Sequence, residues 1–181
     1  IKTVSEDATK AFTVHVDAGV KGQTIQGFGG MNPNDINLEM CALDQGCSMM
    51  RYTIDWDFEL SNDNLNPYAL DRSKLKSSAI DFEYLKRAYD LGIKDIFVTL
   101  WSPPAWMKLN LSGVSGADIS NPATSLNKVD PMYYDEYVEY MVSITRMIKE
   151  ETGIELAGFC PQNEPMFNEP YGSAILPPVE F

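Results

Sequence analysis

The sequence predicts an α/β protein built from parallel strand–helix units. Short apolar runs at residues 48–54, 95–100 and 154–160 are bounded by turn residues and are too short for helices, so they are typical of buried strands. Helical patterns at residues 81–91 and 131–152 separate these runs. Because strands and helices alternate, we expect a parallel sheet with right-handed crossovers and a cover of helices.

Two further strands and a short helix are expected nearer the N-terminus. Residues 12–16 alternate between apolar and polar side chains, which indicates an early strand with one polar face. Residues 26–31 form the next expected strand. A short helix is expected at residues 35–45, ending near Gly46.

Both longer helices carry signals for their starts and ends. Ser78 is the expected cap of the first, and Gly92 follows its last residue. In the second, Asp130 is expected to cap the helix, Pro131 takes the first helical position, and Gly153 ends it. These signals support helices rather than further strands in both segments.

Parallel strand–helix units build either a doubly wound sheet or a closed (β/α)8 barrel. A doubly wound nucleotide-binding protein typically has a G-x-G-x-x-G turn between its first strand and helix. The Gly-Phe-Gly-Gly run at residues 27–30 lacks that spacing, and a Met-Asn-Pro sequence follows where a helix should begin. The sequence therefore disfavours nucleotide binding. In the alternative, these glycines lie in the first barrel strand and allow a close backbone approach at the mouth of a pocket.

Composition excludes several classes of partner. The chain has 181 residues, of which 44% are hydrophobic and 22% charged, as in ordinary globular proteins. Its net charge of -12 disfavours nucleic acids and anionic membrane surfaces, which attract basic proteins. No run approaches the roughly 20 apolar residues of a membrane span. The first residues lack the apolar core of a signal peptide, so we expect that any export signal was removed or never existed.

The few histidines and cysteines point away from metal and cofactor chemistry. A Ser-His-Asp or Cys-His catalytic site would have to use His15, the single histidine, and a histidine-rich zinc site is excluded. Cys41, Cys47 and Cys160 lack metal-ligand spacing and allow at most one internal disulfide. We therefore expect no metal and no cofactor, and carboxylates remain as the catalytic groups.

A Gln-Asn-Glu-Pro run at residues 162–165 directly follows the last predicted strand. Barrel enzymes carry their catalytic residues at the carboxyl ends of strands, and a Pro restricts the backbone of the residue before it. Glu164 is therefore a candidate proton donor, although Asn-Glu-Pro is also an ordinary way to leave a strand. The motif recurs at residues 168–170. We expect Glu169 to lie in a loop where its carboxylate is less well held, and we expect Glu169→Gln to retain most activity.

Aromatic residues accompany the acids at the predicted strand ends. Trp56, Trp101 and Trp106 are all the tryptophans of the chain, and each falls at such an end. Sugars present apolar CH faces and many hydroxyl groups, so their sites combine aromatic platforms with polar groups. This pattern indicates a carbohydrate or glycoconjugate ligand, while core packing is an equally ordinary role for Trp106.

The chain resembles the glycoside hydrolase family 30 enzymes, which include glucosylceramidases, β-1,6-glucanases and xylanases. The matching stretches follow the family's order: Ile-Gln-Gly-Phe-Gly-Gly at 25–30, Arg51 with Asp57 and Phe58, Trp-Ser-Pro-Pro-Ala-Trp-Met-Lys at 101–108, and Pro-Gln-Asn-Glu-Pro at 161–165. The resemblance implies a (β/α)8 barrel with an attached β-sandwich. Residues 1–22 would contribute a strand to the sandwich, and residues 23–181 would form the first half of the catalytic barrel.

The resemblance also implies roles for individual residues. Glu164 resembles the acid/base, Asn163 the partner of the sugar 2-hydroxyl, and Arg51 the residue that orients the nucleophile. Asp57 and Trp101 resemble residues that hold the sugar. Of the other residues at the expected pocket mouth, Trp56 and Phe28 are also expected to bind substrate.

The implied reaction is retaining hydrolysis of a β-linked glucan, xylan or glucosylceramide-like substrate, which requires a second carboxylate as nucleophile. In the family this residue is a Glu on the seventh strand, and only about four barrel strands are counted here. We therefore expect the nucleophile to lie outside this chain, in a remaining half supplied in cis or as a second chain. Such a protein is expected to be secreted, extracellular or periplasmic. The alternative is a non-catalytic carbohydrate-binding or structural half-barrel.

Overall fold

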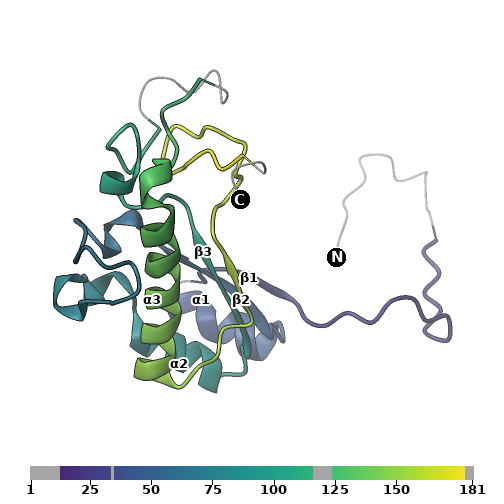
Figure 1. Cartoon of the computed structure of the whole chain (residues 1–181). Coiled ribbons are helices and arrows are strands. Elements are labelled where there is room, and N and C mark those ends of the chain that lie inside the picture. The colour runs from purple at the N-terminus through teal and green to yellow at the C-terminus, as the bar shows by residue number, and fades with distance from the viewer. Residues whose placement is uncertain (1–12, 34, 116–123, 178–181) are drawn as a thin grey trace.

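A computed structural model describes residues 13–33, 35–115 and 124–177 of the chain. Its centre is a parallel sheet of four strands in the order β1-β2-β3-β4. The strands are β1 (Gly29–Met31), β2 (Met49–Ile54), β3 (Asp95–Leu100) and β4 (Gly158–Cys160). The helices are α1 (Asp35–Glu39), continued by a π-helical turn (Met40–Asp44), α2 (Phe82–Asp90) and α3 (Tyr134–Thr152). Figure 1 shows α3 lying along the sheet.

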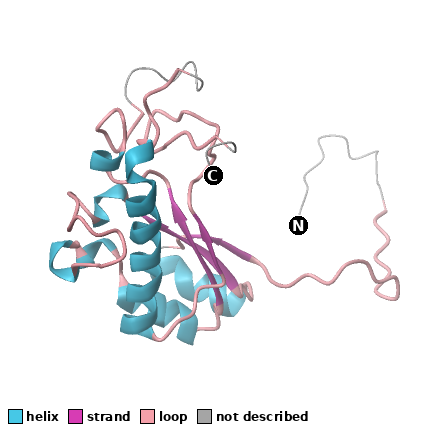
Figure 2. Cartoon of the chain, viewed as in Figure 1, coloured by secondary structure: helices cyan, strands magenta, loops and turns pink. Residues whose placement is uncertain are grey.

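The helices lie on one side of the sheet, as Figure 2 shows. Alternation along β2 agrees, because Met50, Tyr52 and Ile54 are buried while the residues between them are partly exposed. A doubly wound sheet has helices on both faces and a reversal in strand order. Neither is present among the described residues, so the doubly wound alternative does not fit this chain.

The core fills the space between the sheet and the helices. Ile96 and Val98 of β3 are fully buried there. They belong to one cluster with Leu85 of α2 and with Ile144 and Ile148 of α3, all fully buried. Burying a side chain of this size contributes roughly 1.5–3 kcal/mol. Apolar packing against one face therefore holds the strands and helices together.

The helix ends follow local sequence signals, with one correction. The Asp130 carboxylate accepts a hydrogen bond from the backbone N–H of Met132, and Pro131 opens a 3-10 turn that leads into α3. Gly153 ends α3 at φ 75°, a left-handed conformation that favours glycine. The expected cap of α2 was wrong. Asp81 caps it by accepting from Tyr84 N–H, because its carboxylate stands directly before the helix.

Several expected strands are shorter than the sequence indicated. The strand expected at residues 26–31 is formed only by β1, and the run at 154–160 pairs only over β4. Residues 13–16 of the expected early strand lie in no strand, because no described segment pairs with them, and Phe12 lies outside the described residues. This segment is exposed and runs away from the sheet in Figure 1. The assignment of residues 1–22 to a β-sandwich stays a prediction.

One apolar surface remains open beside the last strand. Val138, Met141 and Val142 of α3 face Phe159 and Pro161 across a hollow of about 600 Å³. Val138 on this face of α3 is 52% exposed. Among the described residues nothing covers this side of the α3 helix. No helix in the described part of the chain is long and apolar enough to cross a membrane.

Candidate functional site

The carboxyl ends of β3 and β4 bring two predicted strand-end motifs together. The backbone N–H of Asn163 donates to the Leu100 carbonyl oxygen at 2.8 Å. The Gln162 amide donates to the Trp101 carbonyl oxygen at 2.7 Å. The chain leaving β4 is thus fixed alongside the end of β3, where barrel enzymes place their catalysts.

Arg51 reaches this point from the face of β2 that the helices leave uncovered. Its Nε donates to Thr99 Oγ1 at 2.8 Å and its Nη2 donates to Asn163 Oδ1 at 2.5 Å. The guanidinium also lies 5.8 Å from the Trp101 ring centroid. These contacts fix both the arginine fork and the orientation of the Asn163 amide. The structure thus brings Arg51, Asn163 and Trp101 together.

Glu169 lies on the other side of Asn163 and is fully buried. Its Oε1 accepts from the Tyr171 hydroxyl at 2.8 Å and from Asn163 Nδ2 at 3.5 Å. Burial raises the pKa of the Glu169 carboxyl, and the neighbouring Glu164 carboxyl raises it further. The expectation that Glu169 is the less well held glutamate is therefore wrong, because the loop that carries it folds back against the strand end.

Glu164 itself is exposed and sits at the turn that follows β4. Its backbone has φ 43°, a left-handed conformation that residues other than glycine seldom adopt. Its carbonyl oxygen accepts from Phe167 N–H at 2.8 Å, which closes the turn. Such strained backbone conformations are common at functional sites.

A pocket of about 300 Å³ opens beside these residues. It is lined by Thr53, Asp55, Trp56, Trp101, Tyr171 and Gly172. The Trp101 and Tyr171 rings meet edge to face, with centroids 5.7 Å apart. Trp56 packs against Gly113, where an added Cβ would lie 2.3 Å from the indole. The pocket thus combines aromatic surfaces with a carboxylate and a hydroxyl, as a sugar site requires.

Two predicted site residues, Phe28 and Asp57, lie elsewhere, and so does Trp106, for which the sequence left a packing role open. Phe28 precedes β1 at the amino end of the sheet, because its carbonyl oxygen accepts from Met49 N–H at the start of β2, and it does not line the pocket. The carboxylate of Asp57 is paired with the Lys76 ammonium and does not line the pocket. Trp106 donates its indole N–H to the Glu59 carbonyl oxygen at 3.1 Å, which is a structural role.

The first glycine of β1 serves the sheet rather than the pocket. A Cβ added to Gly29 would lie 1.9 Å from the Met49 carbonyl oxygen. The close approach expected from the sequence is therefore present, but it joins β1 to β2 at their amino ends.

Sequence reasoning missed part of the pocket. Asp55 directly follows β2, so its strand-end position was a usable signal, whereas Asp57 was chosen from the family pattern. Tyr171 comes from an irregular loop, and nothing in the local sequence indicates that it lines the pocket. Only the fold of that loop against Trp101 and Glu169 places it there.

Buried polar contacts hold the Tyr171 loop in position. Lys108 is buried, and its ammonium group donates to Ser102 Oγ at 3.0 Å and to the Ser173 carbonyl oxygen at 2.8 Å. Burial lowers the pKa of Lys108 to about 7. Asn127 donates to Asn168 Oδ1 at 2.7 Å and to the hydroxyl of Ser173 at 2.9 Å. The loop at residues 168–173 is therefore held by hydrogen bonds from residues that follow β3 in the chain.

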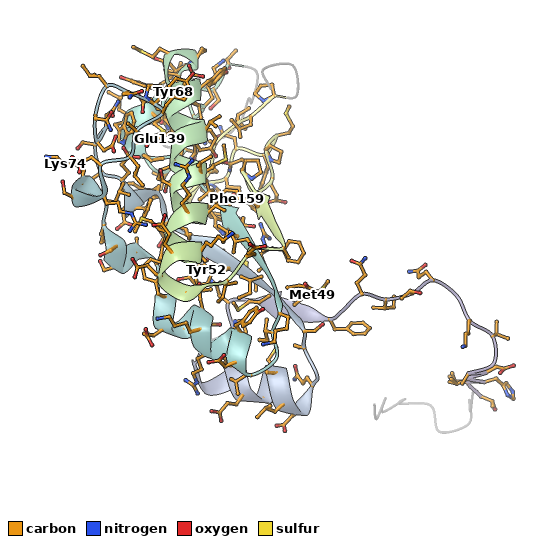
Figure 3. The ribbon with its side chains drawn as sticks, turned by 60° about the horizontal axis from the view of Figure 1, so that its bottom comes forward. Met49, Tyr52, Tyr68, Lys74, Glu139 and Phe159 are labelled. Atoms are coloured by element: carbon orange, nitrogen blue, oxygen red, sulfur yellow. The ribbon has the colours of Figure 1, made fainter. Side chains whose placement is uncertain are left out.

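A second group of acids lies on the helix side of the sheet. Glu59 is 2% exposed, and burial followed by the charges of Asp63, Glu139 and Glu136 raises its pKa to about 8. Burial, followed by the charges of Asp63 and Glu136, raises the pKa of Glu139 to about 7. Figure 3 shows Tyr68 beside Glu139, and both line a hollow of about 360 Å³. Within the described residues no cluster of His, Cys, Asp and Glu has the arrangement needed to hold a metal ion.

Solved structures of glycoside hydrolase family 30 enzymes have a similar fold. The subfamily 8 xylanase Xyn30A from Clostridium acetobutylicum superposes with a TM-score of 0.66 at 21% identity, over 90% of this chain and 38% of that chain. An endo-β-1,6-glucanase superposes with a TM-score of 0.62 at 22% identity, over 91% of this chain and 40% of that chain.

The catalytic domain of xylanase C from Talaromyces cellulolyticus has a TM-score of 0.59 at 22% identity, over 85% of this chain and 40% of that one. The chain thus spans well under half the length of the solved enzymes that it matches. No protein-family model and no curated protein sequence matches it. Together, the parallel sheet, its order and these similarities show that the chain has a glycoside hydrolase family 30-like fold.

Proposed function

We propose that this chain forms the first half of a (β/α)8 barrel in a retaining β-glycoside hydrolase. The observation that carries the proposal is the Arg51–Asn163 contact beside Glu164 and a pocket lined by Trp101. A carboxylic acid, an oriented amide and aromatic surfaces are the groups that glycoside cleavage uses. The xylanases and the endo-β-1,6-glucanase among the similar structures favour a β-linked glucan or xylan, and a glucosylceramide-like substrate fits the same chemistry.

In the proposed reaction, Glu164 protonates the leaving oxygen and later accepts the proton of the attacking water. Asn163 Nδ2 makes only a 3.5 Å contact with Glu169, so it remains able to donate to the sugar 2-hydroxyl. Trp101 and Trp56 supply the aromatic surface, and Asp55 is added to the residues that hold the sugar.

The nucleophile is proposed to come from the remaining half of the protein, in cis or as a second chain. Retention needs it about 5–5.5 Å from the acid/base. Arg51 lines a hollow of about 290 Å³ on the uncovered face of the sheet, where such a carboxylate would meet its fork. The apolar side of α3 beside Phe159 is the surface on which the next strand–helix unit would pack.

Closure of the barrel, the β-sandwich strand within residues 1–22 and a secreted, extracellular or periplasmic location complete the proposal. The acidic net charge of -12 suits a neutral carbohydrate rather than a nucleic acid.

A second candidate is a non-catalytic carbohydrate-binding or structural half-barrel. One observation favours it: Trp56, Trp101 and Tyr171 complete the aromatic pocket within this chain, without any nucleophile. Binding of β-linked oligosaccharides without turnover would identify this function.

The test uses the native protein, whose intact mass gives its length. We expect it to hydrolyse a β-glycoside with a β-anomeric first product, observed by NMR. Glu164→Gln should abolish glycosylation by substrates with poor leaving groups and spare activated aryl glycosides, which need no proton. Glu83→Gln, on a side chain that is 86% exposed, is the matched control. Equal loss on both kinds of substrate would show that Glu164 is not the acid.

A further inference from the structure

The buried Glu169 carboxyl has no role in the reaction described so far. It is fully buried, and its Oε2 has no hydrogen-bond partner among the described residues. Leaving an ionised oxygen buried and unpaired costs several kcal/mol, so such a group normally carries a proton or meets one. Oε2 therefore needs a proton. The titratable groups that act on this carboxyl are Glu164 and Tyr171, and Tyr171 donates to Oε1 instead.

We propose that Glu169 is a positioning residue whose buried carboxyl keeps a proton on Oε2 and donates it as a hydrogen bond to the Glu164 carboxyl. The inference rests on the proposed function, in which Glu164 is the acid/base. When Glu164 gives its proton to the leaving oxygen, the O–H of Glu169 donates a hydrogen bond to the carboxylate that forms. When water attacks, Glu164 takes a proton from it, and that hydrogen bond weakens again. Glu169 keeps its own proton throughout.

The contacts of Oε1 fix the carboxyl group for this task. Tyr171 O–H donates to it at 2.8 Å and Asn163 Nδ2 at 3.5 Å, so Oε1 acts as the acceptor and Oε2 is left as the site of the proton. Asn163 is in turn held by Arg51 through its Oδ1 at 2.5 Å. Glu169 thus connects the amide proposed for substrate contact with the carboxyl proposed as acid.

The charged surroundings agree with a neutral Glu169. Glu164 and Tyr171 face it from its own loop, and both hydrogen bonding and charge at Glu164 raise the pKa of Glu169 in addition to burial. Arg51 of β2 lies beyond the neutral Asn163 amide. Lys108, from the segment after β3, binds the loop backbone at Ser173 rather than the carboxyl.

The closing experiment follows the carboxyl carbons of the native protein, labelled with ¹³C-glutamate, by NMR across pH, with Glu169 assigned through its own backbone resonances. We expect Glu169 to titrate above the ordinary glutamate value. Glu164→Gln should lower the pKa of Glu169, because it removes a neighbouring charge that raises it. Tyr171→Phe should raise the pKa of Glu169, since it removes a donor to the ionised form.

An ordinary titration of Glu169, or one that Glu164→Gln leaves unchanged, would overturn the inference. Should the Glu169 variants fail to fold, Glu164→Gln and Tyr171→Phe still report on Glu169, because both alter exposed side chains. Glu83→Gln is the control for the substitution itself.

The enzymatic arm separates this inference from the proposed function. In the native protein, Glu169→Leu removes the O–H donor and should shift the pH dependence of kcat/KM. Glu169→Gln, whose neutral amide can still donate a hydrogen bond, should keep the wild-type profile. A merely structural role would lower activity equally at every pH. Hydrolysis by Glu169→Leu with an unshifted pH profile would reject the inference and keep the function. Coupled titration without any hydrolysis of β-glycosides would reject the proposed function instead.

Discussion

Replacing the buried Glu59 by Gln should make the protein more stable at neutral and alkaline pH. Glu59 is 2% exposed, and its pKa rises from 4.5 to about 8, chiefly by burial. When the pKa of a carboxyl is higher in the folded than in the unfolded protein, the protein loses stability as the pH rises from the unfolded pKa through the folded pKa. The free energy of unfolding should therefore fall between pH 4.5 and about 8 in the wild type.

The size of the effect follows from this shift. At pH 7, Glu59 is ionised in the unfolded protein but not in the folded one. At about 1.4 kcal/mol for each pKa unit, this difference lowers the free energy of unfolding by up to about 3 kcal/mol. Gln is neutral at every pH, and its amide oxygen can still accept from Asp63 N–H, which lies at 3.1 Å. Since water entry and loop relaxation reduce the full value, we expect Glu59→Gln to gain about 1–3 kcal/mol at pH 8 and nothing below pH 4.

Denaturant unfolding at pH 4, 6 and 8 measures this gain. Glu83→Gln, at an exposed position, should show no comparable trend. A gain that does not depend on pH, or a loss of stability at pH 8, would refute the reasoning from Glu59 burial.

Two further predictions concern the arginine fork and the uncovered helix. Arg51→Lys in the native protein should lower kcat at least tenfold, about 1.4 kcal/mol of barrier, with an unchanged circular dichroism spectrum, because one ammonium cannot replace the fork that binds Thr99 and Asn163. Wild-type turnover would place Arg51 outside the site. Residues 1–181 alone should associate in sedimentation experiments, since Val138 and Val142 are exposed, and should hydrolyse no β-glycoside. A soluble monomer that hydrolyses with retention would contradict this.

Local chemistry explains why much of the fold was predictable from the sequence. Asp130, Pro131 and Gly153 act on neighbours within one turn of helix, so their effect on α3 depends little on the rest of the chain. The strands β2 and β3 are short apolar runs between turn residues, and the structure confirms both. Glu164 and Asn163 follow a strand directly, so sequence alone places them at its carboxyl end.

The tertiary structure decided what lies around those residues. Glu169 and Tyr171 belong to an irregular loop whose position depends on Lys108 and on other residues far away in the sequence, so no local pattern announces that Glu169 is buried. Phe28 was expected in the site but lies at the amino end of the sheet. A sequence motif does not show at which end of a strand a residue lies. Sequence determined the periodicity, the helix ends and the strand-end acid, which are properties of near neighbours. Burial, and with it the choice of which carboxyl holds a proton, arises only when distant segments pack together.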